Sequence, residues 1–162
     1  MSAIDHLLHA NQKYAVAFPG PRPIRPRLRL AVIACMDSRL DLFGALGLDV
    51  GDAHLIRNAG GLPTDDTLRS LAISQRSLGT REVVLIHHTE CGMEGFDDAA
   101  FRAELTAAGG PQPRWDVPGF TDIHATMRHS IGVVRECAWL PYRDDVRGFI
   151  FDTATAQLEE VG

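Results

Sequence analysis

Three short apolar runs, separated by segments of helical periodicity, constrain this chain more than any other feature. The runs cover residues 28–35, 53–58 and 82–88, and each has the length and composition of a strand buried on both faces. Between the second and third runs, residues 64–79 have the apolar spacing, the capping residues and the glycine stop of a helix. Strands that alternate with helices join through right-handed crossovers into a mostly parallel sheet. The sequence therefore predicts an α/β fold.

The second half of the chain continues this alternation. Residues 97–108 and 123–138 have helical periodicity, and an irregular loop rich in Gly and Pro lies between them. A fourth apolar run at residues 146–152 predicts another strand, which a short hairpin can join to residues 157–161. Because 162 residues is an ordinary length for one domain, we expect a single domain over residues 1–162.

The N-terminal segment has a different character. Residues 3–17 form an amphipathic pattern that Ser2 and Asp5 can cap. Four prolines between residues 19 and 26 then forbid a helix and favour a stiff, extended linker. The Pro23-x-x-Pro26 spacing among arginines also fits a peptide ligand or a basic arm. An amphipathic helix on a stiff linker needs a partner surface, and a second subunit is the obvious supplier.

Composition narrows the class of protein. Sixteen Lys and Arg against 21 Asp and Glu give a net charge of −5, which argues against nucleic acid as a partner of the whole domain. No apolar run approaches the roughly 18 residues that cross a bilayer, and the N-terminus lacks the order of a signal peptide. Three cysteines, an odd number, do not indicate a disulfide framework. We expect a soluble, cytoplasmic protein without a membrane or nucleic-acid partner.

Metal-binding side chains follow the first and third predicted strands. Cys35 ends the first run, His88 ends the third, and Cys91 follows three residues after His88. If these strands are neighbours, their carboxyl ends bring the three side chains together, where ligands bind in open α/β sheets. Two thiolates and one imidazole suit a zinc ion whose fourth position stays open for water. A Cys–His nucleophile without metal and a chance placement are the alternatives.

Two charged residues strengthen the metal hypothesis. On an extended segment Cys35, Asp37 and Arg39 point to one side. Asp37 would then lie beside a metal held by Cys35, where it can accept a hydrogen bond from metal-bound water or reach the metal itself. Arg39 has the right spacing to hold that carboxylate in a two-pronged ion pair and keep it ionised. A surface Asp–Arg pair in a loop is the alternative.

Three segments together resemble the signature segments of the β-class carbonic anhydrases, in that family's order. They are Ala34-Cys35-Met36-Asp37-Ser38-Arg39, Arg57-Asn58-Ala59-Gly60 and His88-Thr89-Glu90-Cys91-Gly92. The resemblance covers about residues 1–160. The short chain and the sequence around His88 are similar to the compact bacterial branch, which is also similar to hydrolases of carbonyl sulfide and carbon disulfide.

The resemblance implies a fold, a site and an assembly. The fold is a mostly parallel four-stranded core sheet with an extra edge strand and helices on both faces. Cys35, His88 and Cys91 bind one zinc ion per subunit, and Asp37 and Arg39 form the catalytic dyad. In a closed form only, Asp37 becomes the fourth zinc ligand. The assembly is a homodimer or tetramer, in which the helix and Pro-rich arm of residues 1–27 mediate dimerisation.

The function implied is reversible hydration of CO2 to bicarbonate and a proton by zinc-bound hydroxide. Asp37 accepts a hydrogen bond from the hydroxide, and Arg39 holds Asp37 off the metal. Two thiolate ligands make the metal-bound water less acidic, so activity should rise toward alkaline pH. Hydrolysis of COS or CS2 at the same zinc site is one alternative. A non-catalytic zinc-binding domain, permanently closed by Asp37, is the second.

One residue departs from the family pattern. His87 stands where many relatives have a small residue before the zinc histidine. Because side chains alternate along a strand, His87 should point away from the zinc side, as a packed or hydrogen-bonded histidine.

Overall fold

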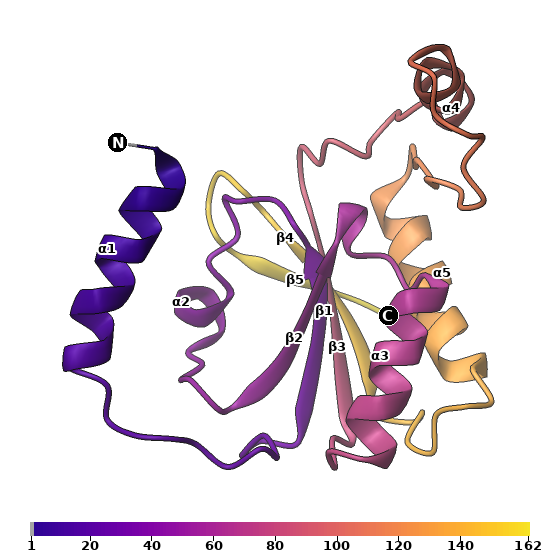
Figure 1. Cartoon of the computed structure of the whole chain (residues 1–162). Coiled ribbons are helices and arrows are strands. Elements are labelled where there is room, and N and C mark those ends of the chain that lie inside the picture. Colours follow the sequence, from indigo (N-terminus) through magenta and orange to yellow (C-terminus); the bar gives the residue numbers. More distant parts are fainter. Residues whose placement is uncertain (1) are drawn as a thin grey trace.

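Five strands form one sheet in the order β2-β1-β3-β4-β5 (Figure 1). The computed structural model describes residues 2–162. Strands β1 to β4 run parallel, and β5 pairs antiparallel with β4 at the edge. The strands are β1 (Leu30–Cys35), β2 (Ala53–Asn58), β3 (Glu82–His88), β4 (Val146–Phe151) and β5 (Leu158–Val161). The predicted four-stranded parallel core with an added edge strand is confirmed.

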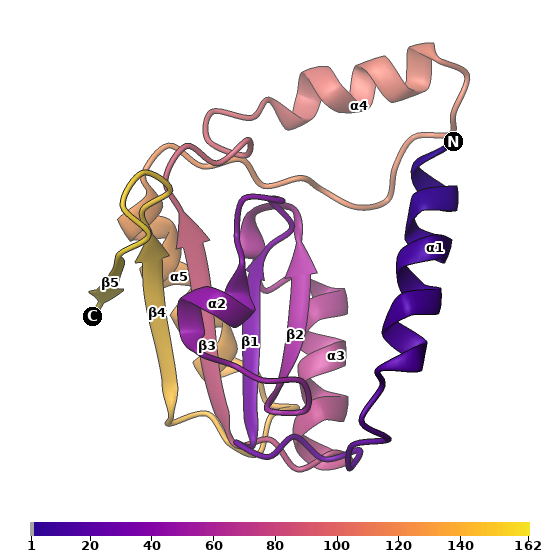
Figure 2. The same ribbon diagram turned by 90° about the vertical axis from the view of Figure 1, so that its left-hand side faces the viewer.

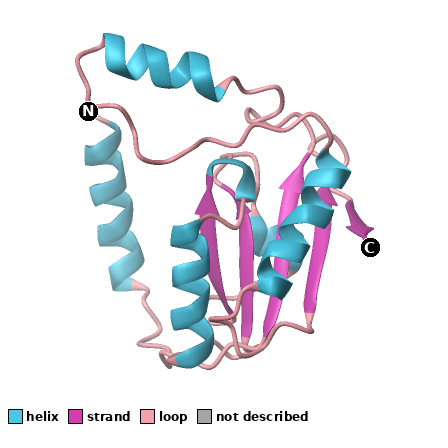
Figure 3. Ribbon diagram, turned by 90° about the vertical axis from the view of Figure 1, so that its right-hand side faces the viewer, coloured by secondary structure: helices cyan, strands magenta, loops and turns pink. Residues whose placement is uncertain are grey.

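Helices cover both faces of the sheet, as predicted, but unequally. Helices α3 (Asp65–Arg76) and α5 (Ile123–Glu136) lie over one face (Figure 3). The short helix α2 (Leu42–Leu46) lies over the other (Figure 2). Beyond the carboxyl ends of the strands lie the 3-10 turn η1 (Ala59–Gly61) and helix α4 (Asp98–Ala107). No helix within residues 2–162 combines the length and the apolar character that a membrane span requires.

The side chains of β1 divide the core into two layers. Ala31 and Ile33 pack in a cluster with side chains of α3 and α5. Val32 and Ala34 pack on the opposite face, in a cluster that includes Leu42 of α2. All four β1 side chains are fully buried, which explains why this strand is a continuous apolar run rather than an alternating one.

The strand order creates a switch point beside β1. The chain passes from β1 to β2 on one side and then crosses to β3 on the other side of β1. Ala34 of β1 pairs with Ile86 of β3, so Cys35 and His88 end neighbouring strands at the same edge of the sheet. Because the two connections leave in opposite directions, this edge is the place where ligands bind in open α/β sheets.

The N-terminal helix α1 (Ala3–Val16) stands apart from the sheet (Figures 1 and 3). It begins at the predicted capping box, in which the Ser2 hydroxyl accepts from Asp5 N and the Asp5 carboxylate accepts from Ser2 N. None of its residues is buried. The linker that follows runs along the lower edge of the sheet (Figure 2), where Arg27 forms a two-pronged ion pair with Asp52 at 2.7 and 3.0 Å.

At two elements the backbone explains why the observed boundary differs from the predicted one. The first strand begins at Leu30 rather than at residue 28, because Arg29 has a left-handed backbone with φ +54°. The helix predicted over residues 123–138 ends at Glu136, because Cys137 is extended, with φ −67° and ψ 108°.

Candidate metal centre

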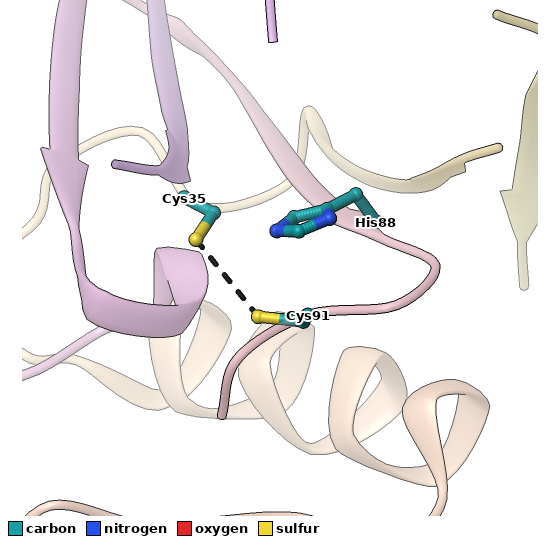
Figure 4. Close-up of side chains that lie close together, drawn as sticks. All are labelled: Cys35, His88 and Cys91. Carbon is teal, nitrogen blue, oxygen red and sulfur yellow. Dashed lines mark hydrogen bonds between the residues drawn. The ribbon is translucent and has the colours of Figure 1, made fainter. Parts of the chain in front are cut away.

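Three metal-binding side chains meet at the carboxyl ends of β1 and β3 (Figure 4). Cys35 is the last residue of β1, His88 is the last residue of β3, and Cys91 follows in the next loop. One ligand atom from each lies within 4.8 Å of the other two. All three residues are buried. The structure thus brings together the three residues that the sequence analysis selected, and no other residue within 2–162 joins them.

The distances and the unpaired atoms fit a zinc ion. The two Sγ atoms are 3.9 Å apart, and two thiolates bound tetrahedrally to one zinc at about 2.3 Å each would be about 3.8 Å apart. His88 Nδ1 lies 2.9 Å from the carbonyl oxygen of Thr89, which can only accept, so Nδ1 carries the proton. Nε2 of His88 is then a buried acceptor without a hydrogen-bond partner. A histidine fixed in this way presents one nitrogen to a metal.

The buried thiols can lose their protons together only if a cation binds between them. Burial raises the pKa of the Cys91 thiol to about 11, and the neighbouring Cys35 thiol adds to the increase. Two buried thiolates at this distance would repel one another without a positive charge between them. A zinc ion supplies that charge and deprotonates the thiols that bind it.

Asp37 lies beside the cluster and is held by Arg39. Oδ2 of Asp37 is 3.8 Å from His88 Nε2. Arg39 donates from its backbone N and from Nε to Oδ1, and from Nη2 to Oδ2. Hydrogen bonds from the Arg39 side chain and then from its backbone hold the pKa of the Asp37 carboxyl well below its ordinary value. Arg39 is itself held, since Nη2 also donates to the Glu90 carbonyl at 2.9 Å.

Known proteins resemble the chain along its whole length. A protein-family model described as carbonic anhydrase matches residues 30–108. The chain is 44% identical over 161 residues to the β-carbonic anhydrase 1 of Mycobacterium tuberculosis, and the alignment covers 99% of each protein. The chain belongs to the β-carbonic anhydrase family.

Two further proteins are similar to the chain. The crystal structure of the carbonic anhydrase from Streptococcus mutans has a TM-score of 0.91 and 40% sequence identity, covering 100% of this chain and 99% of that one. A carbon disulfide hydrolase of Acidithiobacillus thiooxidans is 36% identical over 151 residues, which are 80% of this chain and 75% of that protein. The chain is thus similar both to β-carbonic anhydrases and to a hydrolase that is named for a different substrate.

Arg57 anchors the end of β1 at Cys35 and the following loop with Asp37 in this β-carbonic anhydrase. Its Nε donates to the Cys35 carbonyl at 2.9 Å, its Nη2 to the Asp37 carbonyl at 2.6 Å and its Nη1 to the Leu40 carbonyl at 3.3 Å. No role for Arg57 follows from the sequence alone. The only signal for it was its place in the second signature segment.

The turn after β2 presses against the metal-binding strands. Asn58 holds this turn, because its side chain accepts from Leu62 N at 2.8 Å and donates to the Leu62 carbonyl at 2.7 Å. Gly61 in the turn has φ +65°, and a Cβ there would lie 2.7 Å from Cys35 N and 3.0 Å from the Ile86 carbonyl oxygen. Only glycine fits this approach, since it lacks a Cβ and accepts a positive φ.

His87 packs in the interior, as the alternation of the strand predicted. It is not part of the cluster of metal-binding side chains within residues 2–162. Its ring stacks on Phe120 with 6.2 Å between centroids and 14° between planes. Burial lowers the pKa of His87 to about 4, so the ring stays neutral near pH 7.

Proposed function

We propose that this protein is a zinc-dependent carbonic anhydrase, which converts CO2 and water reversibly into bicarbonate and a proton. The observation that carries the proposal is the buried Cys35–His88–Cys91 cluster with an ionised carboxylate, Asp37, beside it. Full-length identity of 44% to a β-carbonic anhydrase supports the same activity.

Cys35, His88 and Cys91 would hold one zinc ion per chain. When bound, the ion supplies the Lewis acidity that lets a water molecule act as a nucleophile near neutral pH. Three protein ligands leave one tetrahedral position for water or substrate, as catalytic zinc sites require. The buried Nε2 of His88 and the Sγ spacing support this ligand set.

We assign Asp37 the role of orienting the attacking water. Its lowered pKa keeps the carboxylate ionised, so it can only accept hydrogen bonds. By accepting a proton of the water in a hydrogen bond, Asp37 would direct an oxygen lone pair toward CO2.

Arg39 acts as a positioning residue for Asp37. Its guanidinium donates to both oxygens of the Asp37 carboxylate and also to the Glu90 carbonyl. If Arg39 releases Asp37, the carboxylate is near enough to become the fourth zinc ligand, since Oδ2 is already 3.8 Å from His88 Nε2. The hydrogen bonds between Arg39 and Asp37 support an open form, in which Asp37 is not a zinc ligand.

The N-terminal helix and linker, residues 1–27, would form the dimer contact. Met1 lies outside the described residues, but within 2–27 the helix exposes Ile4, Leu7 and Leu8 and buries none of its residues. We expect a homodimer or a tetramer by sedimentation, and a monomer when all three residues are changed to Ser. A wild-type monomer would contradict this assembly.

A reducing compartment, the cytoplasm, suits this chemistry. The described cysteines are free thiols, and the proposed ligand set needs Cys35 and Cys91 reduced rather than oxidised. The substrates are small molecules, CO2 and bicarbonate, and the net charge of −5 offers no general attraction for nucleic acid.

CO2 and CS2 are the substrates to compare, because the ligand set does not separate these linear molecules and a CS2 hydrolase is 36% identical to the chain. The test is stopped-flow CO2 hydration by zinc-loaded protein from about pH 7 to about pH 9, the range in which zinc-bound water ionises, with CS2 hydrolysis measured on the same sample. We expect CO2 hydration that rises with pH.

Cysteine variants provide the matched control. Cys91→Ser should abolish CO2 hydration, whereas Cys137→Ser, outside the cluster, should keep it. Hydrolysis of CS2 without hydration of CO2 would overturn the proposal in favour of the sulfur substrate. Absence of both activities in zinc-loaded protein would favour a non-catalytic zinc domain.

A further inference from the structure

Three arginines line one cavity at the end of the sheet opposite the metal cluster. The cavity has a volume of about 220 Å³, and its lining includes Arg25, Arg29, Arg81, Gly79 and Tyr142. Arg29 immediately precedes β1 and Arg81 immediately precedes β3. The cavity therefore lies at the amino ends of these two strands, whereas the metal cluster lies at their carboxyl ends.

A buried amide fixes one wall of this cavity. Gln75 of α3 is buried, and its side chain donates to the Tyr142 carbonyl at 2.8 Å and accepts from Tyr142 N at 3.1 Å. The guanidinium of Arg81 lies over the Tyr142 ring, 5.3 Å from its centroid. These contacts hold Arg81 in place by its packing against an aromatic face.

The backbone positions the other two arginines. Arg29 has a left-handed conformation, φ +54°, and its carbonyl accepts from Arg81 N at 2.7 Å, which ties the two cavity segments together. A non-glycine residue in this conformation carries strain that the surroundings must impose. At Gly79, φ is +83° and a Cβ would lie 3.7 Å from Cδ of Arg25, so the Arg25 stem packs directly over the glycine.

The three guanidiniums are not neutralised by the described part of the chain. Within residues 2–162, no carboxylate oxygen lies within 4.0 Å of a side-chain nitrogen of Arg25, Arg29 or Arg81. The neighbouring Arg27, in contrast, is paired with Asp52. No acidic residue lines the cavity. The three arginines that line this cavity are exposed and have no ion-pair partner among the described residues, and three like charges around one space are complementary to an anion.

We propose that this cavity binds a small dianionic phosphate group. Guanidinium forks match the oxygens of phosphate and form paired, charge-assisted hydrogen bonds with it. A dianion compensates more of the three positive charges than a monoanion such as bicarbonate. The volume suits an inorganic phosphate or the terminal phosphate of a small organic monoester, and the two sources share the same chemistry.

The test is an NMR titration of zinc-loaded protein with inorganic phosphate, followed by glycerol 3-phosphate. The amide signals of Gly79 and Arg81 report on the cavity, and that of Gly92 reports on the metal cluster. We expect saturable shifts at Gly79 and Arg81. Arg81→Gln should weaken phosphate binding there about tenfold or more, with its CO2 hydration unchanged. Arg114→Gln removes the same charge from an exposed loop position and should bind phosphate as the wild type does.

The two ligands distinguish the source of the phosphate. Binding of both supports recognition of a terminal phosphate group, and binding of inorganic phosphate alone supports the free ion. Shifts confined to Gly92, no saturation at Gly79, equal binding of bicarbonate, or equal phosphate binding by the Arg81 and Arg114 variants would each overturn the proposal. Since the readout is binding at the opposite end of the sheet, failure here leaves the carbonic anhydrase activity untouched.

Discussion

Arg39 holds the carboxylate of Asp37 with three hydrogen bonds of 2.9 to 3.0 Å. One of the donors is the backbone N of Arg39, so the pairing depends on the local turn as well as on the side chain. Asp37 therefore stays ionised beside the metal cluster. Arg39, which is not part of that cluster, holds the carboxylate in place. This arrangement separates the proposed zinc ligands from the residue proposed to orient the substrate water.

Asp37→Asn should lower kcat/KM for CO2 hydration by about 10²-fold or more, while zinc content stays at one ion per chain. The amide keeps the shape of the side chain but loses the ionised acceptor. Asp66→Asn is the matched control, since Asp66 also pairs with an arginine, Arg69, on the surface of α3. Stopped-flow rates and metal analysis check the result, and full activity of the Asp37 variant would remove this residue from the mechanism.

Arg39→Gln should release Asp37 toward the metal. Without the guanidinium the pKa of Asp37 returns toward its ordinary value, because the Arg39 side chain is the largest cause of the decrease. We expect reduced CO2 hydration together with a carboxylate oxygen in the zinc coordination sphere by X-ray absorption. Arg69→Gln should change neither. A zinc site in the Arg39 variant that never gains a carboxylate ligand, at low or at high pH, would exclude the closed form.

Gly61→Ala should destabilise the fold by about 2–4 kcal/mol, because the added Cβ meets backbone and the residue has a positive φ. Gly132→Ala is the control. Gly132 lies in α5 with no atom within 4 Å of an added Cβ, and alanine there should stabilise the helix by up to about 1 kcal/mol. Urea unfolding of both variants measures the difference. Similar values for the two would show that the turn does not press on Cys35.

The pair between Arg27 and Asp52 should make stability depend on pH. Hydrogen bonds from the Arg27 side chain and then from Asp49 N lower the pKa of Asp52. The stabilisation is therefore present above the unfolded-state pKa of about 3.9 and is lost as pH falls through the lower folded value. Urea unfolding should show Asp52→Asn less stable than the wild type by a constant amount from about pH 7 to about pH 5, and by less below about pH 4. A difference that persists unchanged in acid would contradict this pairing.

The metal cluster was predictable from sequence because it consists of metal-binding residue types at or just after the ends of predicted strands. Cys35 and His88 end apolar runs, and Cys91 follows shortly after the second of them. Neighbouring parallel strands bring these ends together at one edge of the sheet. The orientation of His87 followed from the twofold alternation of a strand, and the capping box of Ser2 and Asp5 from local spacing alone.

Other parts of the site were not predictable in the same way. Arg57 donates to three carbonyls 17 to 22 positions earlier in the chain. No sequence pattern predicts which distant carbonyls a long side chain reaches. The close contact between Gly61 and β1 depends on how near the turn after β2 comes to the backbone of β1 and β3. The cavity of Arg25, Arg29 and Arg81 depends on the strained turn at Arg29, which also shortened the first strand relative to its apolar run.

The central claim is that a zinc ion held by Cys35, His88 and Cys91 makes this chain a carbonic anhydrase. The most direct measurement is the rate of CO2 hydration as zinc is titrated into metal-stripped protein. We expect negligible catalysis without zinc and a rate that rises in proportion to bound zinc until each chain holds one ion. Catalysis by the metal-free protein, or one bound zinc per chain without catalysis, would contradict it.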